Sequence, residues 1–309
     1  MLRYFIQRIL LLIPVLIGIS LLVFFIMSFT PGTPGDIMLG DLAPESAKRE
    51  LNESLGYYDP FFIRYFNYVG GAIRGDFGLS YRSRLPVFDE IAGRFPTTFG
   101  LALTSMVIAM VIGIPLGIYS AVRQYSPMDN INTILAMVFV SIPSFWLGLL
   151  MILFFSLYLR WLPSFGADTF RHYIMPSLAV SGSTMATLLR MTRSTMLEVL
   201  RQDYIRTAYA KGANERRVIL KHAIKNAMIP IITVIGVNFG AMLGGAVIIE
   251  SVFGMPGIGN MMLLAIRTKD IPIVMGGVLV VAVLFGLINL MLDLTYTFID
   301  PRIKAHYRK

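Results

Sequence analysis

The chain has 309 residues, of which 56% are hydrophobic and only 15% charged, and its mean hydropathy is +0.69. Soluble domains carry roughly 25% charged residues, so the composition excludes an ordinary soluble protein and makes the bilayer the solvent for most of the chain. The formal charge is +9, and the absence of cysteine excludes disulfides and thiolate metal sites.

The N-terminal segment carries Arg3 and Arg8 and then an apolar run over residues 9–29. A secretory signal would have a shorter apolar core, of roughly 7–15 residues, and a small-residue cleavage site. This run instead ends at the turn sequence "TPGTPGD". Because a helix of about 20 apolar residues crosses the bilayer, we expect residues 1–29 to form a retained N-terminal transmembrane helix.

Residues 30–98 are predicted to form a folded extracytoplasmic loop region. The stretch "DPFFIRYFNYVGGAIRGDFGLSY" places aromatic residues at close intervals and glycines at turn positions. Charged residues further on, among them Arg82, Arg84 and Asp89, keep the region water-soluble. We expect a helix over residues 60–69, followed by a glycine-rich turn.

Five more apolar segments follow, and each is long enough to be considered as a spanning helix. They cover residues 99–122, 131–159, 173–189, 227–249 and 273–299. The 173–189 segment is short and rich in serine and threonine, which indicates a helix that faces protein or water rather than lipid. The expected fold is an all-α integral membrane protein with six transmembrane helices, in which residues 99–309 form a core of five.

Orientation is predicted from the lysine and arginine content of the short loops, which is higher on the cytoplasmic side. The segment 190–226 holds nine basic residues, whereas 160–172 and 250–272 hold two each. This contrast predicts that 190–226 and both termini are cytoplasmic. We expect a multi-pass protein of the cytoplasmic (inner) membrane of a prokaryote.

A capped corner is predicted at the basic stretch "RTAYAKGANERRVILKHAIKNAMIP", residues 206–230. Asp203 is a suitable N-cap for a short helix, and Gly212 supplies the left-handed residue that ends it. Asn214 can cap a second helix, with Glu215 favourably placed in its positive first turn. That second helix carries an apolar stripe formed by Leu220, Ala223, Ile224, Ala227 and Met228.

Three interpretations of this stretch compete: a helix bound to anionic headgroups, a nucleic-acid site, and a rigid element that docks into a groove of a cytoplasmic partner. A nucleic-acid site fits poorly because the loop is short and tethered to a bilayer. Charge alone would need neither a capped corner nor a helix face that carries Tyr204, Ala208 and Tyr209 beside Ile205. These features favour docking.

The stretch "DYIRTAYAKGANERRVILKHAIKNAMIP", residues 203–230, resembles the cytoplasmic loop of membrane permease subunits of binding-protein-dependent ABC importers. In the general pattern of that loop, Gly212 takes the glycine position and Ala208 the last alanine of E-A-A. The run R-T-A-x-A-K-G resembles the oligopeptide/dipeptide branch, which includes nickel carriers. Other segments resemble the same branch over nearly the whole chain, namely 12–36, 75–103, 250–274 and 299–304.

The resemblance implies the type I permease fold of ABC importers and a subunit of an ATP-driven importer of dipeptides or oligopeptides, with nickel or oligosaccharides as alternative solutes. Such a subunit is not an enzyme. The implied partners are a homologous second permease subunit in a heterodimer, two cytoplasmic ABC ATPases, an extracytoplasmic solute-binding protein and membrane lipid, with no nucleic acid. We expect no cofactor or metal on this chain, which lacks the G-x-x-x-x-G-K-[ST] loop, and ATP and Mg would be bound by the ATPases.

The resemblance also makes residues 203–214 a coupling helix. The residues expected to take part in coupling to the ATPases are Asp203, Tyr204, Arg206, Thr207, Ala208, Tyr209, Lys211, Gly212 and Glu215. We expect the face with Tyr204, Ala208 and Tyr209 to pack in a groove of the ATPase, while Arg206 and Lys211 pair with acidic groups at its rim. Closure of the ATPase pair would then displace this corner, and the fourth and fifth spans with it, as a rigid body.

Two further sets of residues are assigned within the spans. A translocation path is expected to include Ser141, Ser144, Ser183, Thr187 and Asn238, and the alternative for these polar groups is a bond to backbone or to a neighbouring helix. Small residues at four-residue spacing predict close helix packing or a sliding gate contact, and they are Gly236, Gly240 and Gly244. Near the inner end of the last span, Asp293 is either a functional acid or the ion-pair partner of Arg190 or Arg193.

The segment after Glu250 predicts a tight turn and a short helix over residues 259–268. This helix is expected to be a re-entrant gate, part of the receptor for the binding protein, or a plain connector.

Two other protein classes fit the sequence less well. A membrane enzyme needs a catalytic constellation, but His172, His222 and His306 are far apart in sequence and no H-E-x-x-H motif occurs. An ion-coupled secondary transporter typically has repeated halves and intramembrane ionisable groups, which six dissimilar spans and one marginal acid do not provide.

Overall fold

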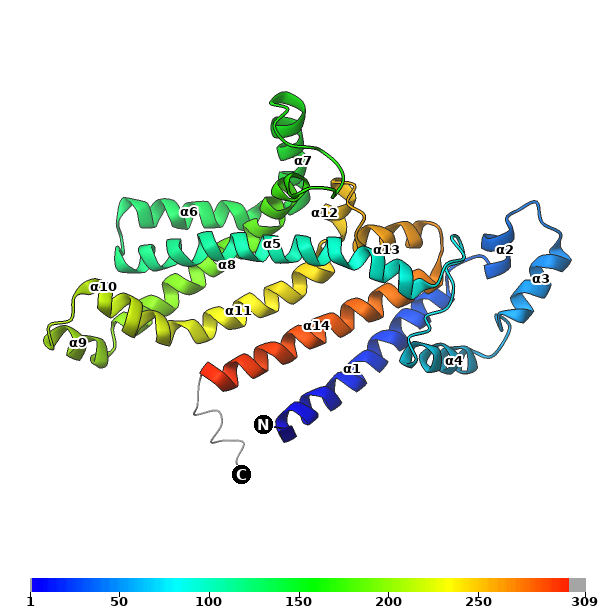
Figure 1. The fold of residues 1–309 in the computed structure, drawn as a ribbon, viewed down its shortest axis with the longest axis horizontal. Helices are drawn as coiled ribbons and strands as arrows, with labels where there is room; N and C mark the ends of the chain where they lie inside the picture. Colours follow the sequence, from blue (N-terminus) through cyan, green and yellow to red (C-terminus); the bar gives the residue numbers. More distant parts are fainter. Residues whose placement is uncertain (1, 300–309) are drawn as a thin grey trace.

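Long apolar helices run side by side along most of the chain (Figure 1). The structure is a computed structural model that describes residues 2–299. Its helices are α1 (Leu2–Ser28), α2 (Pro34–Leu39), α3 (Glu45–Ser54), α4 (Phe61–Ile73), α5 (Val87–Val122), α6 (Pro127–Ser141), α7 (Ser144–Met151), η1 (Ile152–Tyr158), α8 (Phe170–Leu200), α9 (Asp203–Ala210), α10 (Glu215–Arg217), η2 (Val218–Ala223), α11 (Ile224–Gly245), α12 (Val247–Val252), α13 (Ile258–Arg267) and α14 (Ile271–Ile299). Within residues 2–299, strand pairing is confined to an isolated antiparallel bridge between Leu79 and Pro86. The all-α fold class predicted from the sequence is confirmed.

Four helical segments of the described chain are long and apolar enough to cross a membrane, namely Ile6–Ser28, Val87–Val122, Glu215–Gly244 and Ile271–Leu292. A fifth is obtained if α6 and the helix formed by α7 and η1 are taken together as one broken span. The 31-residue α8 is about 47 Å long, but it contains many serine, threonine and arginine residues. The count of six crossings therefore stays a prediction.

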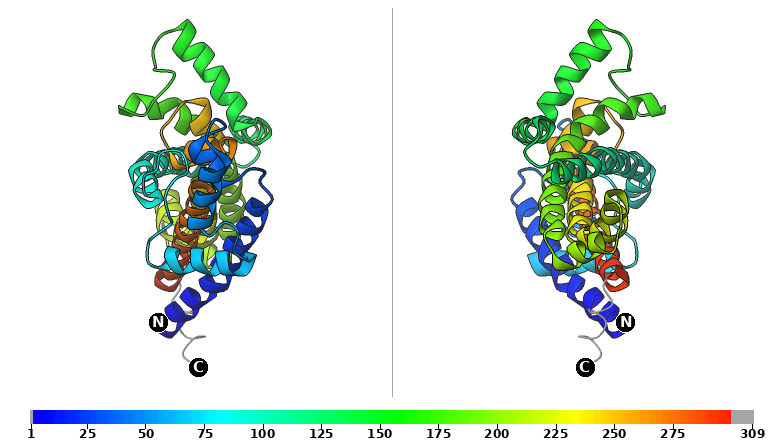
Figure 2. Two further views of the ribbon diagram at one scale, coloured as in Figure 1. Left: turned by 90° about the vertical axis from the view of Figure 1, so that its right-hand side faces the viewer. Right: turned by 90° about the vertical axis from the view of Figure 1, so that its left-hand side faces the viewer.

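The expected span over residues 131–159 is not continuous. α6 ends at Ser141, and the helix from Ser144 to Tyr158 leaves it at an angle of 98°. Ile142 has an extended backbone, with φ −82° and ψ 122°, because the ring of Pro143 disfavours the helical conformation at the residue before it. Figure 2 shows that α7 and η1 project away from the other helices as a result.

α5 and α8 pack closely and run in the same direction. Gly100 lies against Tyr173 near their starts, and Gly117 lies against Thr192 near their ends. A Cβ atom on Gly113 would lie 2.6 Å from the carbonyl oxygen of Met185, so this approach of the two backbones requires glycine. Parallel directions are what the predicted topology requires of its second and fourth spans.

α14 runs antiparallel to both α1 and α11. Along α1, Leu12 lies against Gly286, and Phe24 packs with Met275. Along α11, Gly236 lies against Leu292 and Gly244 lies against Val281. These directions agree with the predicted topology, in which the last span crosses in the direction opposite to the first and the fifth.

Apart from α7, η1 and α12, the short helices lie at two opposite ends of the bundle (Figure 1). α9 and α10 lie at one end, where α5 finishes and α11 begins, whereas α2, α3, α4 and α13 lie at the other. The boundary drawn between residues 98 and 99 falls inside α5, which already begins at Val87. Asp89 and Glu90 stabilise that earlier start because they lie in the positive first turn of the helix.

The predicted helix over residues 60–69 is longer than expected. α4 begins at Phe61 and continues through Gly70 and Gly71 to Ile73, so the glycine-rich turn predicted after residue 69 is wrong. A Cβ atom on Gly71 would lie 2.8 Å from the carbonyl oxygen of Asp76. Gly71 therefore lets the returning chain pack against the helix, and the turn itself is made by Gly75, with φ +82°.

Candidate functional site

The corner predicted at Gly212 is present. Gly212 has φ +81°, in the left-handed region that favours glycine. Its N–H donates a hydrogen bond to the carbonyl oxygen of Tyr209 at 2.9 Å, and the Ala213 N–H donates to the carbonyl oxygen of Ala208 at 3.2 Å. This pair of bonds is the Schellman arrangement, which satisfies the last carbonyls of α9 and fixes the direction in which the chain leaves it.

Side chains and backbone also define the start of each helix at the corner. Asn214 Oδ1 accepts a hydrogen bond from the Arg217 N–H at 2.9 Å and so caps α10 as expected. The N-cap of α9 is Gln202 rather than Asp203, because Gln202 is the extended residue and Asp203 is already helical. In the first turn, the Asp203 carboxylate lies 3.6 Å from Arg206 and favours the positive end of the helix.

α9 is anchored to its own chain through its inner face. Ile205 is only 1% exposed and packs in one cluster with Met196 of α8, Val218 of η2 and Ala227 of α11. Ala208 packs against the same cluster. Ala208, which was predicted to lie in the docking face, is thus partly buried against this chain and only partly available to a partner.

The outer face of α9 remains open. Tyr204 and Tyr209 are 44% and 46% exposed, and Arg206, Thr207 and Lys211 are exposed beside them. Gly212 and Glu215 continue this exposed surface around the corner. Two aromatic rings among cations on an anchored helix form a surface suited to an apolar groove with an acidic rim.

The second helix departs from the regular geometry that the sequence predicted. Residues Val218–Ala223 form a π-helix, η2, before α11 continues the same direction. Ala223 and Ala227 are buried and Ile224 and Met228 are half-buried, as the predicted stripe requires, and Val218 is buried beside them. Leu220 is instead exposed, because the wider turns of the π-helix rotate it away from the cluster.

Sequence reasoning missed an ion pair near this end of the bundle. Arg193 of α8 donates from Nε and Nη2 to both carboxylate oxygens of Asp129 in α6, at 2.7 and 2.8 Å. The Tyr125 N–H also donates to Asp129, at 2.9 Å, and ties in the turn between α5 and α6. The sequence offers Arg193 as one of two possible partners of Asp293, but the side chain of Asp293 lies outside the described residues. Residues 300–304, the end of the segment 299–304 that resembles the family, also lie outside them.

The residues assigned to the translocation path have separate environments. Ser141 and Thr187 each donate to a carbonyl oxygen one turn earlier in their own helix, at 2.9 Å, and Ser144 and Ser183 are exposed. Asn238 donates to the carbonyl oxygen of Val234 and accepts from Thr184 of α8 at 3.4 Å. Among the residues that the structure describes, no hydrogen bond joins Ser141 or Ser144 to the other three.

The profile described as "Binding-protein-dependent transport system inner membrane component" matches residues 113–305, and its N-terminal companion profile matches residues 1–102. The chain belongs to this family of importer permeases. It is therefore a multi-pass protein of the inner membrane.

Characterised relatives match the permease over almost its whole length. The dipeptide transport system permease protein DppB of Alkalihalophilus pseudofirmus is 42% identical over 98% of this chain and 100% of its own. The glutathione transport system permease protein GsiC of Escherichia coli K12 is 41% identical over 98% of this chain and 99% of its own. The inward-facing MetNI methionine ABC transporter shares the fold, with a TM-score of 0.55 and 17% identity over 68% of this chain and 96% of that one.

Within the permease, three glycines of α11 lie against α14. A Cβ atom on Gly236 would lie 2.0 Å from Leu292, and one on Gly240 would lie 2.7 Å from Phe285. The same face continues at Gly244, which lies against Val281. The absence of side chains at these positions lets the two helices approach closely.

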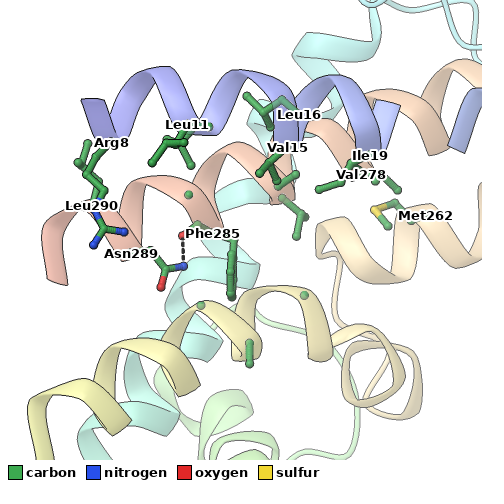
Figure 3. A pocket seen from close by; sticks show the side chains of 17 residues that line it. Arg8, Leu11, Val15, Leu16, Ile19, Met262, Val278, Phe285, Asn289 and Leu290 are labelled. Atoms are coloured by element: carbon green, nitrogen blue, oxygen red, sulfur yellow. Dashed lines mark hydrogen bonds between the residues drawn. The ribbon is translucent and has the colours of Figure 1, made fainter. Parts of the chain in front are cut away.

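A cleft of about 690 Å³ opens beside this contact, between α1, α11 and α14 (Figure 3). Figure 3 shows Leu11, Val15 and Ile19 of α1 along one wall and Phe285 of α14 on the other. Asn289, at one end, donates to the carbonyl oxygen of Phe285 at 2.8 Å. Its apolar walls suit hydrocarbon rather than a polar solute.

At the opposite end of the permease, a buried carboxylate fixes the turn between α12 and α13. Glu250 is fully buried and accepts hydrogen bonds from Thr98 Oγ1 at 2.7 Å and from the Asn260 N–H at 2.9 Å. A Cβ atom on Gly257 would lie 2.2 Å from this carboxylate, so the turn requires glycine there. Burial raises the pKa of Glu250.

The short helix predicted over residues 259–268 is observed as α13.

Proposed function

We propose that this permease moves small peptides across the cytoplasmic membrane and that separate ATPases drive it through α9. The similarity to dipeptide and glutathione permeases over 98% of the chain carries the choice of solute. Dipeptides and glutathione share a peptide backbone with free carboxylate and ammonium groups. No observation on this chain favours nickel, oligosaccharides or ion coupling over that choice.

The proposed assembly has three kinds of protein partner. A homologous second permease subunit completes the translocation unit as a heterodimer, two cytoplasmic ABC ATPases bind ATP and Mg, and an extracytoplasmic protein delivers the solute. The chain contains no G-x-x-x-x-G-K-[ST] sequence, which supports ATP hydrolysis on a separate subunit. The concentration of basic residues in 190–226 supports a cytoplasmic location for α9 and for both termini.

The anchoring of α9 supports a mechanical role for it. An ATPase that closes around ATP displaces the exposed face formed by Tyr204, Arg206 and Tyr209. Because Ile205 and Ala208 pack against α8, η2 and α11 on the other face, the displacement reaches these helices without deforming α9. The Schellman bonds across Gly212 hold the angle between the two arms during this movement.

Reconstitution of the whole importer in liposomes tests the proposal. The permease, its homologous subunit, both ATPases and the binding protein are combined, and uptake of a radiolabelled dipeptide is measured. We expect uptake to require internal ATP and external binding protein and to be indifferent to ionophores. Uptake that follows an ion gradient without ATP contradicts the proposal, as does transport of nickel or an oligosaccharide in place of the dipeptide.

A further inference from the structure

A second cavity lies at the end of the permease opposite α9. It has a volume of about 460 Å³, within the range of about 300–1,000 Å³ that is typical of small-molecule sites. α4, the segment around residues 55–59, the segment 76–81 and the beginning of α14 enclose it. Phe24, at the outer end of α1, and Met275 contribute apolar wall.

Arg64 of α4 places a cation in this cavity. Its guanidinium carbon lies 4.8 Å from the centre of the Tyr57 ring and 5.7 Å from that of Phe24, so the two rings hold it in place. Among the described residues, no Asp or Glu oxygen lies within 4.0 Å of its nitrogens. The planar guanidinium therefore keeps its paired donors, which match the two oxygens of a carboxylate.

A hydroxyl group in the same cavity also lacks a hydrogen-bond partner among the described residues. The Tyr68 hydroxyl is buried, and no described group forms a hydrogen bond with it. Buried donors are nearly always satisfied in folded proteins, so an orphan hydroxyl in a cavity wall indicates that a bound group completes it. Burial raises the pKa of Tyr81, another lining residue, to about 12, and this phenol stays neutral near pH 7.

Negative groups lie elsewhere on the lining. Asp59 and Asp76 are exposed acids of the cavity wall, and Asp76 Oδ1 accepts a hydrogen bond from the Gly78 N–H at 2.9 Å. The cavity thus combines one unpaired cation and an orphan donor with two acids and apolar walls. A small zwitterion with an apolar side chain satisfies all of these groups together.

We propose that this cavity binds a short peptide, with its carboxylate on Arg64 and Tyr68 and its ammonium group toward Asp59 and Asp76. The choice of a peptide rests on the proposed function. The permease itself would then hold the solute at the α4 end of the bundle, in a site built entirely from this chain.

Equilibrium binding to the full chain in lipid nanodiscs tests the site, with radiolabelled alanyl-leucine as the probe. We expect saturable binding, a loss of at least tenfold in affinity for Arg64→Gln, and a smaller loss for Tyr68→Phe. The matched control is Arg74→Gln, which removes the arginine that follows α4 and does not line the cavity; it should bind like the wild type. Wild-type affinity in Arg64→Gln, or no saturable binding by the wild type, overturns the inference.

Altered peptides test the same contacts on the wild-type protein. The proposed contacts can therefore be tested even if a variant fails to fold. Alanyl-leucinamide lacks the carboxylate and should bind at least tenfold more weakly to the wild type, and N-acetyl-alanyl-leucine, which lacks the ammonium group, should also bind more weakly. Equal binding of the amide overturns the assignment to Arg64. These binding measurements need no ATPase. A failure to bind the peptide would therefore contradict the site but not ATP-driven uptake. Uptake that is independent of ATP would contradict the proposed function but not binding measured at this site.

Discussion

The Ala213 N–H donates a hydrogen bond to the carbonyl oxygen of Ala208 across Gly212, at 3.2 Å, and this bond sets the angle between α9 and the helix that follows. On the inner side of that angle, Ile205 and Val218 are both buried in one cluster with residues of α8 and α11. The corner is therefore one rigid piece with the bundle, while the two tyrosines on its outer face remain exposed.

Replacing Gly212 with alanine should damage the corner through the backbone alone. A Cβ atom there meets nothing within 4 Å, but φ +81° costs an alanine about 1 kcal/mol. We expect an assembled importer whose ATPase activity responds several-fold less to loaded binding protein. The control is Gly18→Ala, a glycine of α1 whose Cβ would also meet nothing and whose φ is not positive; a normal response in Gly212→Ala would remove the corner from coupling.

Replacing Tyr204 and Tyr209 with alanine should separate docking from stability. Both rings are nearly half exposed, so the thermal unfolding midpoint of the purified permease should change little. Copurification of the ATPases and their stimulation should fall together. Tyr125→Ala removes another exposed tyrosine, 78% exposed, and serves as the control. Unchanged ATPase binding in the double variant would show that the outer face is not the docking surface.

Replacing Ile205 with alanine should instead destabilise the permease. Its side chain is buried at the junction of α8, η2 and α11, and truncation of a buried isoleucine costs about 2–5 kcal/mol. A lowered unfolding midpoint, measured by intrinsic fluorescence in detergent, is the expected result. Ile248→Ala truncates an exposed isoleucine of α12 and should leave the midpoint unchanged; equal effects of the two would contradict the packing described for α9.

Breaking the ion pair between Asp129 and Arg193 should destabilise the end of the bundle near α9. Asp129 is buried but Arg193 is partly exposed, so a cost of about 2 kcal/mol is expected for Asp129→Asn, between the values for exposed and buried pairs. The double variant with Arg193→Gln should be less destabilised than the sum of the two single variants. Additive effects in this cycle would mean that the two side chains do not interact.

The stability of the permease should depend on pH through Glu250. Burial raises the pKa of this group in the folded protein, so the folded state holds its proton more tightly than the unfolded state. The stabilisation that Glu250 gives the folded state is fully present below the ordinary glutamate pKa of about 4.3. It is lost as pH rises through the raised pKa of the folded protein. The unfolding midpoint of the wild type should therefore fall relative to that of Glu250→Gln as pH rises above the ordinary glutamate value. Parallel profiles would contradict this assignment.

The sequence predicts features that are set by local chemistry. Gly212 and Asn214 were assigned correctly because a left-handed C-terminal residue and an N-cap depend only on a few neighbouring atoms. The break at Pro143 was missed because the hydropathy of residues 131–159 describes composition and not the backbone, although proline restricts the residue before it.

Features set by distant segments could not be predicted in this way. Helical periodicity places Ala208 on one face with Tyr204, but only the fold shows that Ala208 packs against a cluster formed by residues of α5, α8, η2 and α11. The pair of Asp129 and Arg193 joins residues 64 positions apart, and no pattern along the chain indicates it. The cavity around Arg64 likewise forms from segments far apart in the sequence, between Phe24 of α1 and Met275 of α14.

Site-specific cross-linking tests the central claim most directly. The chain contains no cysteine, so Tyr209→Cys introduces a unique thiol on the outer face of α9. In the assembled importer, a short thiol-directed photo-cross-linker at this position should join the permease to an ATPase subunit, whereas the same probe at the exposed Val237 of α11 should not. Labelling of position 209 by lipid alone, with no link to an ATPase, would contradict the account.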